Sequence, residues 1–117
     1  MEINFYDIME TDNNNDTISA NVYLYIKKVY NYLRVLGCVT SASQFSEIYL
    51  HKSRDYYARL KCNQLLPSMN AVNNLLGVLE DKCSEYASRP DKKTHYNHIS
   101  HLLKEGYFLQ MKRAESL

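Results

Sequence analysis

Few residues in this chain can make sharp turns, because it contains only 3 glycines and 2 prolines among 117 residues. Folds rich in β-strands need many such turns. Apolar residues make up 45% of the chain, which is too many for a disordered polypeptide and enough for one modest core. We therefore expect an all-α fold, a bundle of four to five helices.

Helical periodicity and capping residues place the first two helices. The segment 20–36 has apolar residues at the spacing of one helical face, with Ser19 as N-cap and Gly37 at the left-handed position after its end. A second helix should start at Ser41, where Gln44 completes a capping box. Its inward-facing residues should be Phe45, Ile48 and Tyr49.

The third helix should be short. Ser53 is expected to cap it, and Arg54, Asp55 and Tyr56 then form its first turn. Its inner side should consist of Tyr57 and Leu60, at i and i+3.

Two longer helices should complete the bundle. Pro67 and Ser68 open a Leu-rich helix that contains Gly77, either because a neighbouring helix approaches closely there or as a tolerated defect. After a break at 88–91, a final helix follows, which Gly106 should end or bend.

Charge is distributed unevenly along the chain. Residues 1–16 carry five acidic and no basic side chains, whereas 27–61 carry seven basic and two acidic ones, in a chain of net charge +1. We expect an acidic, flexible arm over 1–18, a helix-turn-helix domain over 19–87 and a C-terminal helix over 88–117 that can serve dimerisation. Within the arm, INFYDIM (3–9) could be a strand or a partner-docking segment. A basic body suits a polyanion, although helical surfaces often simply carry lysines.

The stretch SQFSEIYLHKSRDYYARLKCNQLLPSMNAVNNLLGVL, residues 43–79, resembles the helix-turn-helix core of the lambda-repressor-like (Cro/Xre-type) DNA-binding family. That family places Gln and an apolar-small pair at the start of its second helix, and a capped recognition helix with polar readers follows. A Pro-Ser pair then opens a Leu-rich helix. The corresponding residues here are Gln44, Phe45, Ser46, Ser53, Arg54, Asp55, Tyr57, Leu60, Pro67, Ser68, Leu75 and Leu79.

The chain departs from the family in two ways. Its turn has no glycine between Phe45 and Ser53 and is one residue longer than usual, and a longer turn can avoid the left-handed residue that glycine normally supplies. Lys61 replaces the family's common acidic residue, which adds positive charge beside a duplex.

The resemblance implies that the helix starting at Ser53 reads the major groove of double-stranded DNA. The implied base contacts are Arg54, Asp55, Tyr56 and Arg59, and the implied phosphate contacts are Gln44, Lys52, Ser53, Lys61 and Asn63. Two alternatives stay open, because Arg59 could simply pair with Asp55 and Tyr56 could be a half-buried packing residue.

The resemblance also implies a homodimer on two half-sites. We expect its interface on the last helix, at Tyr96, Ile99, Leu103 and Tyr107. The main alternative to DNA binding is a protein–protein interaction module, an adaptor or inhibitor, which the 11 tyrosines and the near-neutral total charge would suit.

Other functional classes find little support. His95, His98 and His101 share one side of a helix but have no carboxylate or cysteine at a supporting spacing, so we expect no metal site. No phosphate-binding loop or catalytic motif is present, and we expect neither an enzyme nor a cofactor or small-molecule substrate. Three irregularly spaced cysteines and the lack of a long apolar run or leader predict a cytoplasmic protein without a membrane span.

Overall fold

The computed structural model describes residues 14–116, with side chains from Ile18 onward, and this part of the chain consists of helices and the turns between them, without a strand. Three long helices, α2 (Asn14–Val35), α5 (Met69–Ala87) and α6 (Lys93–Glu115), make up most of it. Two short helices lie between α2 and α5: α3 (Ala42–Gln44), which continues as the π-helix η1 (Phe45–Tyr49), and α4 (Tyr56–Asn63). The prediction of an all-α fold is therefore confirmed for the described residues.

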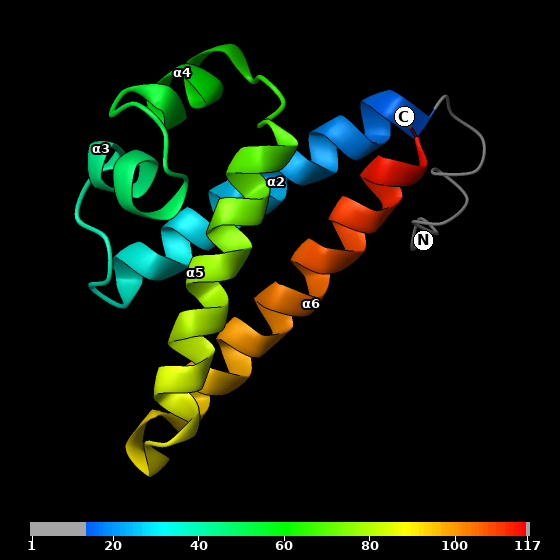
Figure 1. Ribbon diagram of the computed structural model, residues 1–117. Helices are drawn as coiled ribbons and strands as arrows, with labels where there is room; N and C mark the ends of the chain where they lie inside the picture. The colour runs from blue at the N-terminus through cyan, green and yellow to red at the C-terminus, as the bar shows by residue number, and fades with distance from the viewer. Residues whose placement is uncertain (1–13, 117) are drawn as a thin grey trace, which may run out of the picture.

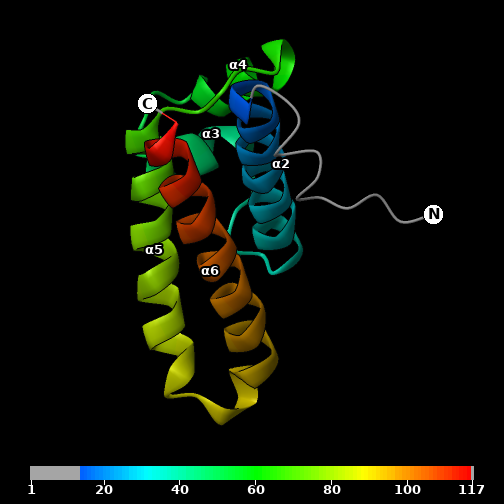
Figure 2. The same ribbon diagram turned by 90° about the vertical axis from the view of Figure 1, so that its right-hand side faces the viewer.

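The long helices form a frame that carries the short ones. α5 and α6 run antiparallel, joined by a short connection that includes the 3₁₀ turn η2 (Pro90–Lys92), and α2 packs along α6 (Figures 1 and 2). α3 and α4 contact each other and lie on the side of α5 away from α6 (Figure 1). In the described residues, no helix is long and apolar enough to cross a membrane.

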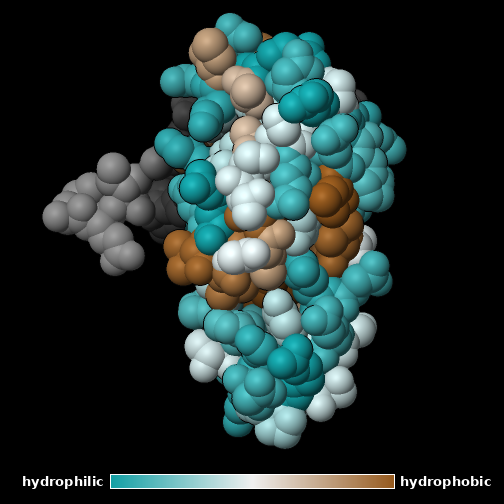
Figure 3. Space-filling view, turned by 90° about the vertical axis from the view of Figure 1, so that its left-hand side faces the viewer, coloured by the Kyte–Doolittle hydropathy of each residue, from teal (hydrophilic) through white to brown (hydrophobic). Residues whose placement is uncertain are grey.

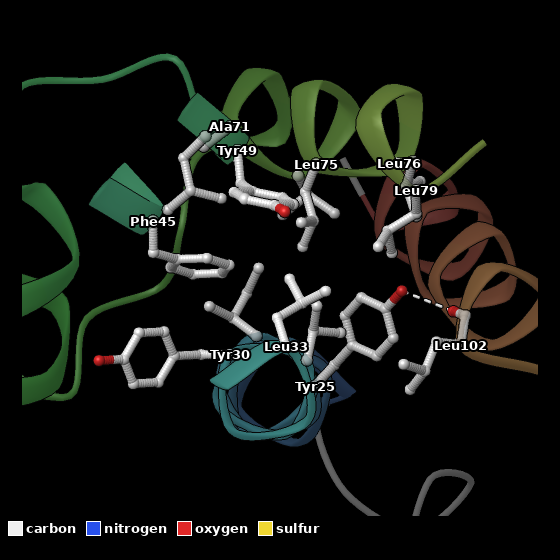
Figure 4. Packing of buried hydrophobic residues seen from close by; sticks show 14 of the residues in the cluster. Tyr25, Tyr30, Leu33, Phe45, Tyr49, Ala71, Leu75, Leu76, Leu79 and Leu102 are labelled. Atoms are coloured by element: carbon white, nitrogen blue, oxygen red, sulfur yellow. Dashed lines mark hydrogen bonds between the residues drawn. The ribbon is translucent and has the colours of Figure 1, made fainter. Parts of the chain in front are cut away.

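One hydrophobic core joins these elements. Phe45 and Tyr49 from the short helices meet Leu33 of α2 and Leu75 of α5 at its centre (Figure 4). At the other side of the core, the Tyr25 hydroxyl donates a hydrogen bond of 2.5 Å to the carbonyl oxygen of Leu102 (Figure 4). Because the buried hydroxyl has a partner, a tyrosine can occupy a position that is only 1% exposed.

The first helix begins earlier than predicted and ends where predicted. α2 starts at Asn14, so Ser19 lies inside it and does not cap it, and residues 14–18 are helical where a flexible arm was expected. The rest of that arm, residues 1–13 with INFYDIM, lies outside the described residues. At the other end Gly37 has φ +77°, and the N–H groups of Gly37 and Cys38 donate to the carbonyls of Arg34 and Leu33, which closes the helix as the glycine predicted.

The second helix starts as predicted but packs differently. Ser41 Oγ accepts from the Gln44 N–H at 3.1 Å, whereas Gln44 Oε1 accepts from the Thr40 N–H at 2.7 Å instead of that of Ser41. Within the π-helix η1 the Ile48 side chain is 52% exposed, whereas Leu50, directly after η1, is buried. The expectation that Ile48 packs inward was wrong.

The two interior glycines have opposite surroundings. Gly77 in α5 is exposed and has open space where a side chain would point, so no helix approaches it closely. Gly106 is buried, and α6 passes through it without a break to Glu115, which corrects the expected end or bend. A methyl group on Gly106 would collide with the Tyr25 hydroxyl and the side chain of Leu76. The close approach of helices therefore occurs at Gly106.

Candidate nucleic-acid interface

The turn before α4 contains a left-handed residue although it has no glycine. His51 has φ +55°, which corrects the expectation that the longer turn avoids this conformation. The Lys52 N–H donates to the Ser46 carbonyl at 2.9 Å and holds the turn against the end of the second helix. A residue other than glycine in this conformation costs roughly 1–2 kcal/mol, so surrounding contacts must hold the turn in place.

α4 begins at Tyr56 and not directly after Ser53. The Ser53 hydroxyl donates to Asp55 Oδ1 at 3.0 Å, and Arg54 and Asp55 form a turn that precedes the helix. The hydroxyl that receives a helix N–H is instead that of Ser46, which accepts from the Tyr57 N–H at 2.9 Å. This structural role of Ser46 could not be seen in the sequence, where only its small size was visible, because Ser46 lies 11 residues before Tyr57.

The inner side of α4 is anchored as predicted. Tyr57 and Leu60 are 1% and 4% exposed. The Tyr57 ring lies 4.7 Å from that of Tyr30 and 5.1 Å from that of Phe45, measured between centroids. Aromatic pairs at this separation add to the stability that burial alone gives. The Tyr57 ring therefore anchors α4 against one aromatic ring of α2 and one of η1.

The outer side of α4 is bare. Arg59 on α4 and Arg54 and Asp55 in the turn before it are exposed, and Arg59 Nε lies 3.5 Å from Asp55 Oδ2. A hydrogen bond from Ser53 and the charge of Arg59 lower the pKa of Asp55, so this carboxylate is ionised at neutral pH. In the free chain the i, i+4 pair therefore forms, whereas Arg54 has no ion pair among the described residues.

Tyr56 has a structural role that the interpretation as a base contact missed. Its hydroxyl accepts a hydrogen bond of 3.0 Å from the Ser68 N–H, at the residue that caps α5. The side chain is half-buried and connects the start of α4 to the start of α5. Tyr56 thus fits the alternative of a half-buried packing residue, whose hydroxyl is engaged with the chain's own backbone.

The predicted phosphate contacts are dispersed. Gln44 lies in the second helix, where its side-chain oxygen accepts a hydrogen bond from the Thr40 N–H. Lys52 Nζ donates to Asn70 Oδ1 at 3.0 Å, beside the start of α5. Asn63 Nδ2 donates to the Arg59 carbonyl at 3.2 Å, and Lys61 is exposed on α4. Lys61 and Asn63 lie on α4, Ser53 lies in the turn before it, and Gln44 lies on the neighbouring helix α3.

The predicted dimer residues do not form one exposed surface. Ile99 is fully buried in the core, so it is not available to a second subunit, and Leu103 is partly buried against the same core. Tyr96 and Tyr107 are 36% and 46% exposed. A hydrogen bond with Glu80 raises the pKa of Tyr107 to about 12.

The histidines on α6 pack against aromatic rings. The His95 ring lies 5.9 Å from that of Tyr86 and the His98 ring 5.1 Å from that of Tyr32. In the part of the chain that the structure describes, no three metal-binding side chains converge.

The chain belongs to a family of unknown function, DUF6626, whose model matches residues 26–112. The matched region contains α3, α4, α5, the C-terminal part of α2 and most of α6, so the candidate interface lies entirely within it. No curated protein and no solved structure matches the chain significantly. The resemblance of residues 43–79 to the lambda-repressor-like family stays a prediction.

Proposed function

We propose that this protein binds double-stranded DNA as a small transcriptional regulator, with α4 and the turn before it entering the major groove. The observation that carries this proposal is the contrast between the two sides of α4. Its inner side is anchored by Tyr57 and Leu60, whereas Arg59 on its outer side and Arg54 in the turn before it are exposed to solvent. A single helix fits the major groove, and arginine recognises guanine through two hydrogen bonds.

The two short helices are proposed to act as a helix-turn-helix. α3 and its continuation η1 contact α4, the turn at 50–55 joins them, and the Ser46 hydroxyl connects them directly. A recognition helix needs such a support, because an isolated helix of this length is unstable in water.

The exposed residues take separate roles in this proposal. Arg54 is the primary base contact, and Arg59 becomes available for a base or phosphate when it leaves Asp55. Asp55 can then accept from a cytosine amine. Lys52, Ser53, Lys61 and Asn63 contact phosphates around the groove, and Gln44 does so from the second helix.

The test is a selection of bound sequences from random duplexes, followed by affinity measurements at several salt concentrations. We expect one enriched site and an affinity that falls steeply with salt. Arg54→Ala should lose the preference at one base pair, with a cost of roughly 1–3 kcal/mol. Lys93→Ala, which removes the same charge at the far end of the hairpin, is the control. No enriched site and no salt-dependent binding by the unaltered chain would refute the proposal.

Exposed apolar side chains favour a second candidate, a protein–protein interaction module. Val35 is 83% exposed and Ile48 52%. The face that carries α3 shows several separate hydrophobic patches among hydrophilic side chains (Figure 3). Such a module would form a stable complex with another protein and would not be retained on DNA at moderate salt.

A homodimer is proposed through the exposed side of α6. Tyr96, Tyr107 and Met111 lie at i, i+11 and i+15, close to one line along the helix, and all three are exposed. Sedimentation of the unaltered chain and of Tyr107→Lys would test this. A monomer at all concentrations would exclude the dimer without excluding DNA binding by one subunit.

A regulator of this kind would work in the cytoplasm, where unpaired cysteines stay reduced.

A further inference from the structure

Two neighbouring lysines on α2 have different surroundings. Lys28 Nζ lies 2.7 Å from Glu105 Oε1 on α6, so its charge is neutralised within the chain. Lys27 is exposed on another side of α2 and lines a hollow with Tyr23 and with Gln64, the residue that follows α4. α2 therefore places one lysine in an ion pair with α6 and one lysine beside the end of α4, where no carboxylate of the described residues pairs with it.

Two more cations lie beside Lys27, around the ring of Tyr30. The guanidinium carbon of Arg34 is 5.8 Å from the centroid of this ring, and Arg34 Nη1 donates to the Tyr30 hydroxyl at 3.3 Å. Lys61 Nζ, from α4, is 6.0 Å from the same centroid and 5.6 Å from that of Tyr57. Aromatic contacts of this kind restrain long cationic side chains while their charges stay in solvent.

The three cations form a row. Lys27 and Arg34 are seven residues apart, about two turns of α2 and roughly 10 Å along its axis. Tyr30, which Lys61 contacts, lies between them. In the described residues no carboxylate pairs with Lys27, Arg34 or Lys61, in contrast to Lys28. An unneutralised row of this kind matches a regularly spaced polyanion.

We propose that Lys27, Lys61 and Arg34 contact the phosphate backbone of the DNA strand that borders the groove entered by α4. This inference deepens the proposed function and rests on it. A length of roughly 10 Å corresponds to about three nucleotides of one strand, at 3.4 Å of rise each. The row shares Lys61 with α4, so a duplex that receives α4 in its groove passes next to α2.

The row has a different task from Arg54. Contacts to phosphates position the protein and carry no sequence information, whereas contacts to base edges do. Removing the row should therefore lower the affinity for every sequence by the same factor. Removing Arg54 should lower it mainly for the preferred site.

The test compares two triple variants of the full chain that lose the same charges. In the row variant Lys27→Gln, Arg34→Gln and Lys61→Gln are combined; in the control variant Arg89→Gln, Lys92→Gln and Lys93→Gln remove one arginine and two lysines at the far end of the α5–α6 hairpin. Circular dichroism and thermal unfolding establish that both fold. The affinity for a duplex of arbitrary sequence and for the selected site is then measured over a range of salt concentrations.

We expect the salt dependence of the row variant, plotted as log K against log salt, to fall by roughly 0.9 for each lost contact. The control variant should keep the slope of the unaltered chain, and both variants should keep the ratio between selected and arbitrary sequence. If the unaltered chain binds DNA and the two variants have equal slopes, the assignment of the row to phosphate contacts is wrong and the proposed function stands. If the unaltered chain binds no duplex, both this assignment and the proposed function are wrong. Retention of the unaltered chain on polyglutamate at a salt concentration that releases DNA would assign the row to an acidic protein and overturn the proposal.

Discussion

The Ser46 hydroxyl accepts a hydrogen bond of 2.9 Å from the backbone N–H of Tyr57, and it donates one of 2.8 Å to the carbonyl oxygen of Ala42. Ser46 is completely buried. One side chain thus satisfies a backbone donor in the first turn of α4 and fixes that turn to the preceding helix. The orientation of the proposed recognition helix depends on this contact between residues 11 positions apart.

Ser46→Ala should therefore destabilise the protein and loosen α4. The change leaves the buried Tyr57 N–H without a partner, which costs roughly 1–3 kcal/mol. Chemical unfolding measures this loss, and hydrogen exchange should show faster exchange in α4 than in α5. Ser53→Ala is the control, because its exposed hydroxyl caps no helix and should change stability by at most about 0.5 kcal/mol. Equal losses in the two variants would contradict the role of Ser46.

Features that depend on near neighbours could be predicted from the sequence. Gly37 ends α2, Ser41 caps the second helix and Ser68 caps α5, and each of these signals acts within a few residues. The start of α4 could not be predicted in this way. Ser53 followed by polar residues is typical of an N-cap, but a hydroxyl from another helix takes that role, and the helix starts at Tyr56.

The glycines differ for the same reason. Both Gly77 and Gly106 lie inside long helices, and no local signal distinguishes them. Only the packing of α6 against α2 and α5 decides that Gly106 is required and Gly77 is not.

Substitution of the two glycines should have opposite effects. Gly77→Ala should stabilise the protein by up to about 1 kcal/mol, because alanine favours the helix and the space is open. Gly106→Ala should destabilise it by roughly 1–3 kcal/mol through overpacking against Tyr25 and Leu76. Thermal unfolding of both variants tests this pair. A stabilising Gly106→Ala would mean that the helices are not in close contact there.

Because the Tyr25 hydroxyl is buried, we expect the protein to lose stability at alkaline pH. Burial, together with the nearby Glu105 and Tyr107, raises the pKa of the Tyr25 hydroxyl far above its ordinary value of about 10. The folded chain therefore holds this proton more tightly than the unfolded chain does. The resulting stability is complete below about pH 10 and is lost as the pH rises above it, by at most about 1.4 kcal/mol per pH unit.

The measurement is urea unfolding at several pH values above and below the ordinary tyrosine pKa. Tyr25→Phe should be less stable than the unaltered chain at neutral pH, since it lacks the hydrogen bond to Leu102, and its stability should fall less steeply in alkali. Burial also raises the pKa of Tyr57, so some dependence should remain. Tyr96→Phe, with its side chain on the surface of α6, should follow the profile of the unaltered chain. A Tyr25→Phe profile with an unchanged slope would refute the assignment.

Sequence reasoning identified the exposed side of α4 but not the contacts within it. Charged residues next to a buried Tyr57 and Leu60 follow from helical periodicity. The sequence left two alternatives for Arg59, a contact with DNA or an ion pair with Asp55. Only the side-chain positions show that the ion pair forms in the free chain. The hydrogen bond between Tyr56 and Ser68 crosses 12 residues, and no spacing rule predicts it.

Asp55→Asn should increase the affinity for DNA of arbitrary sequence. The change removes a negative charge that would lie near phosphates, and it releases Arg59 from its ion pair. Both side chains are exposed and solvent screens their charges, so the gain in affinity should be at most about fivefold. Asp91→Asn is the matched control, because Asp91 Oδ2 likewise lies 3.5 Å from an arginine, Arg89, at the far end of the hairpin. Fluorescence anisotropy with a labelled duplex at low salt measures both affinities.

In Arg59→Ala the same Asp55→Asn change should yield a smaller gain in affinity, since no arginine remains to be released. An equal gain from Asp55→Asn and Asp91→Asn would show that only total charge matters and that α4 is not the contact.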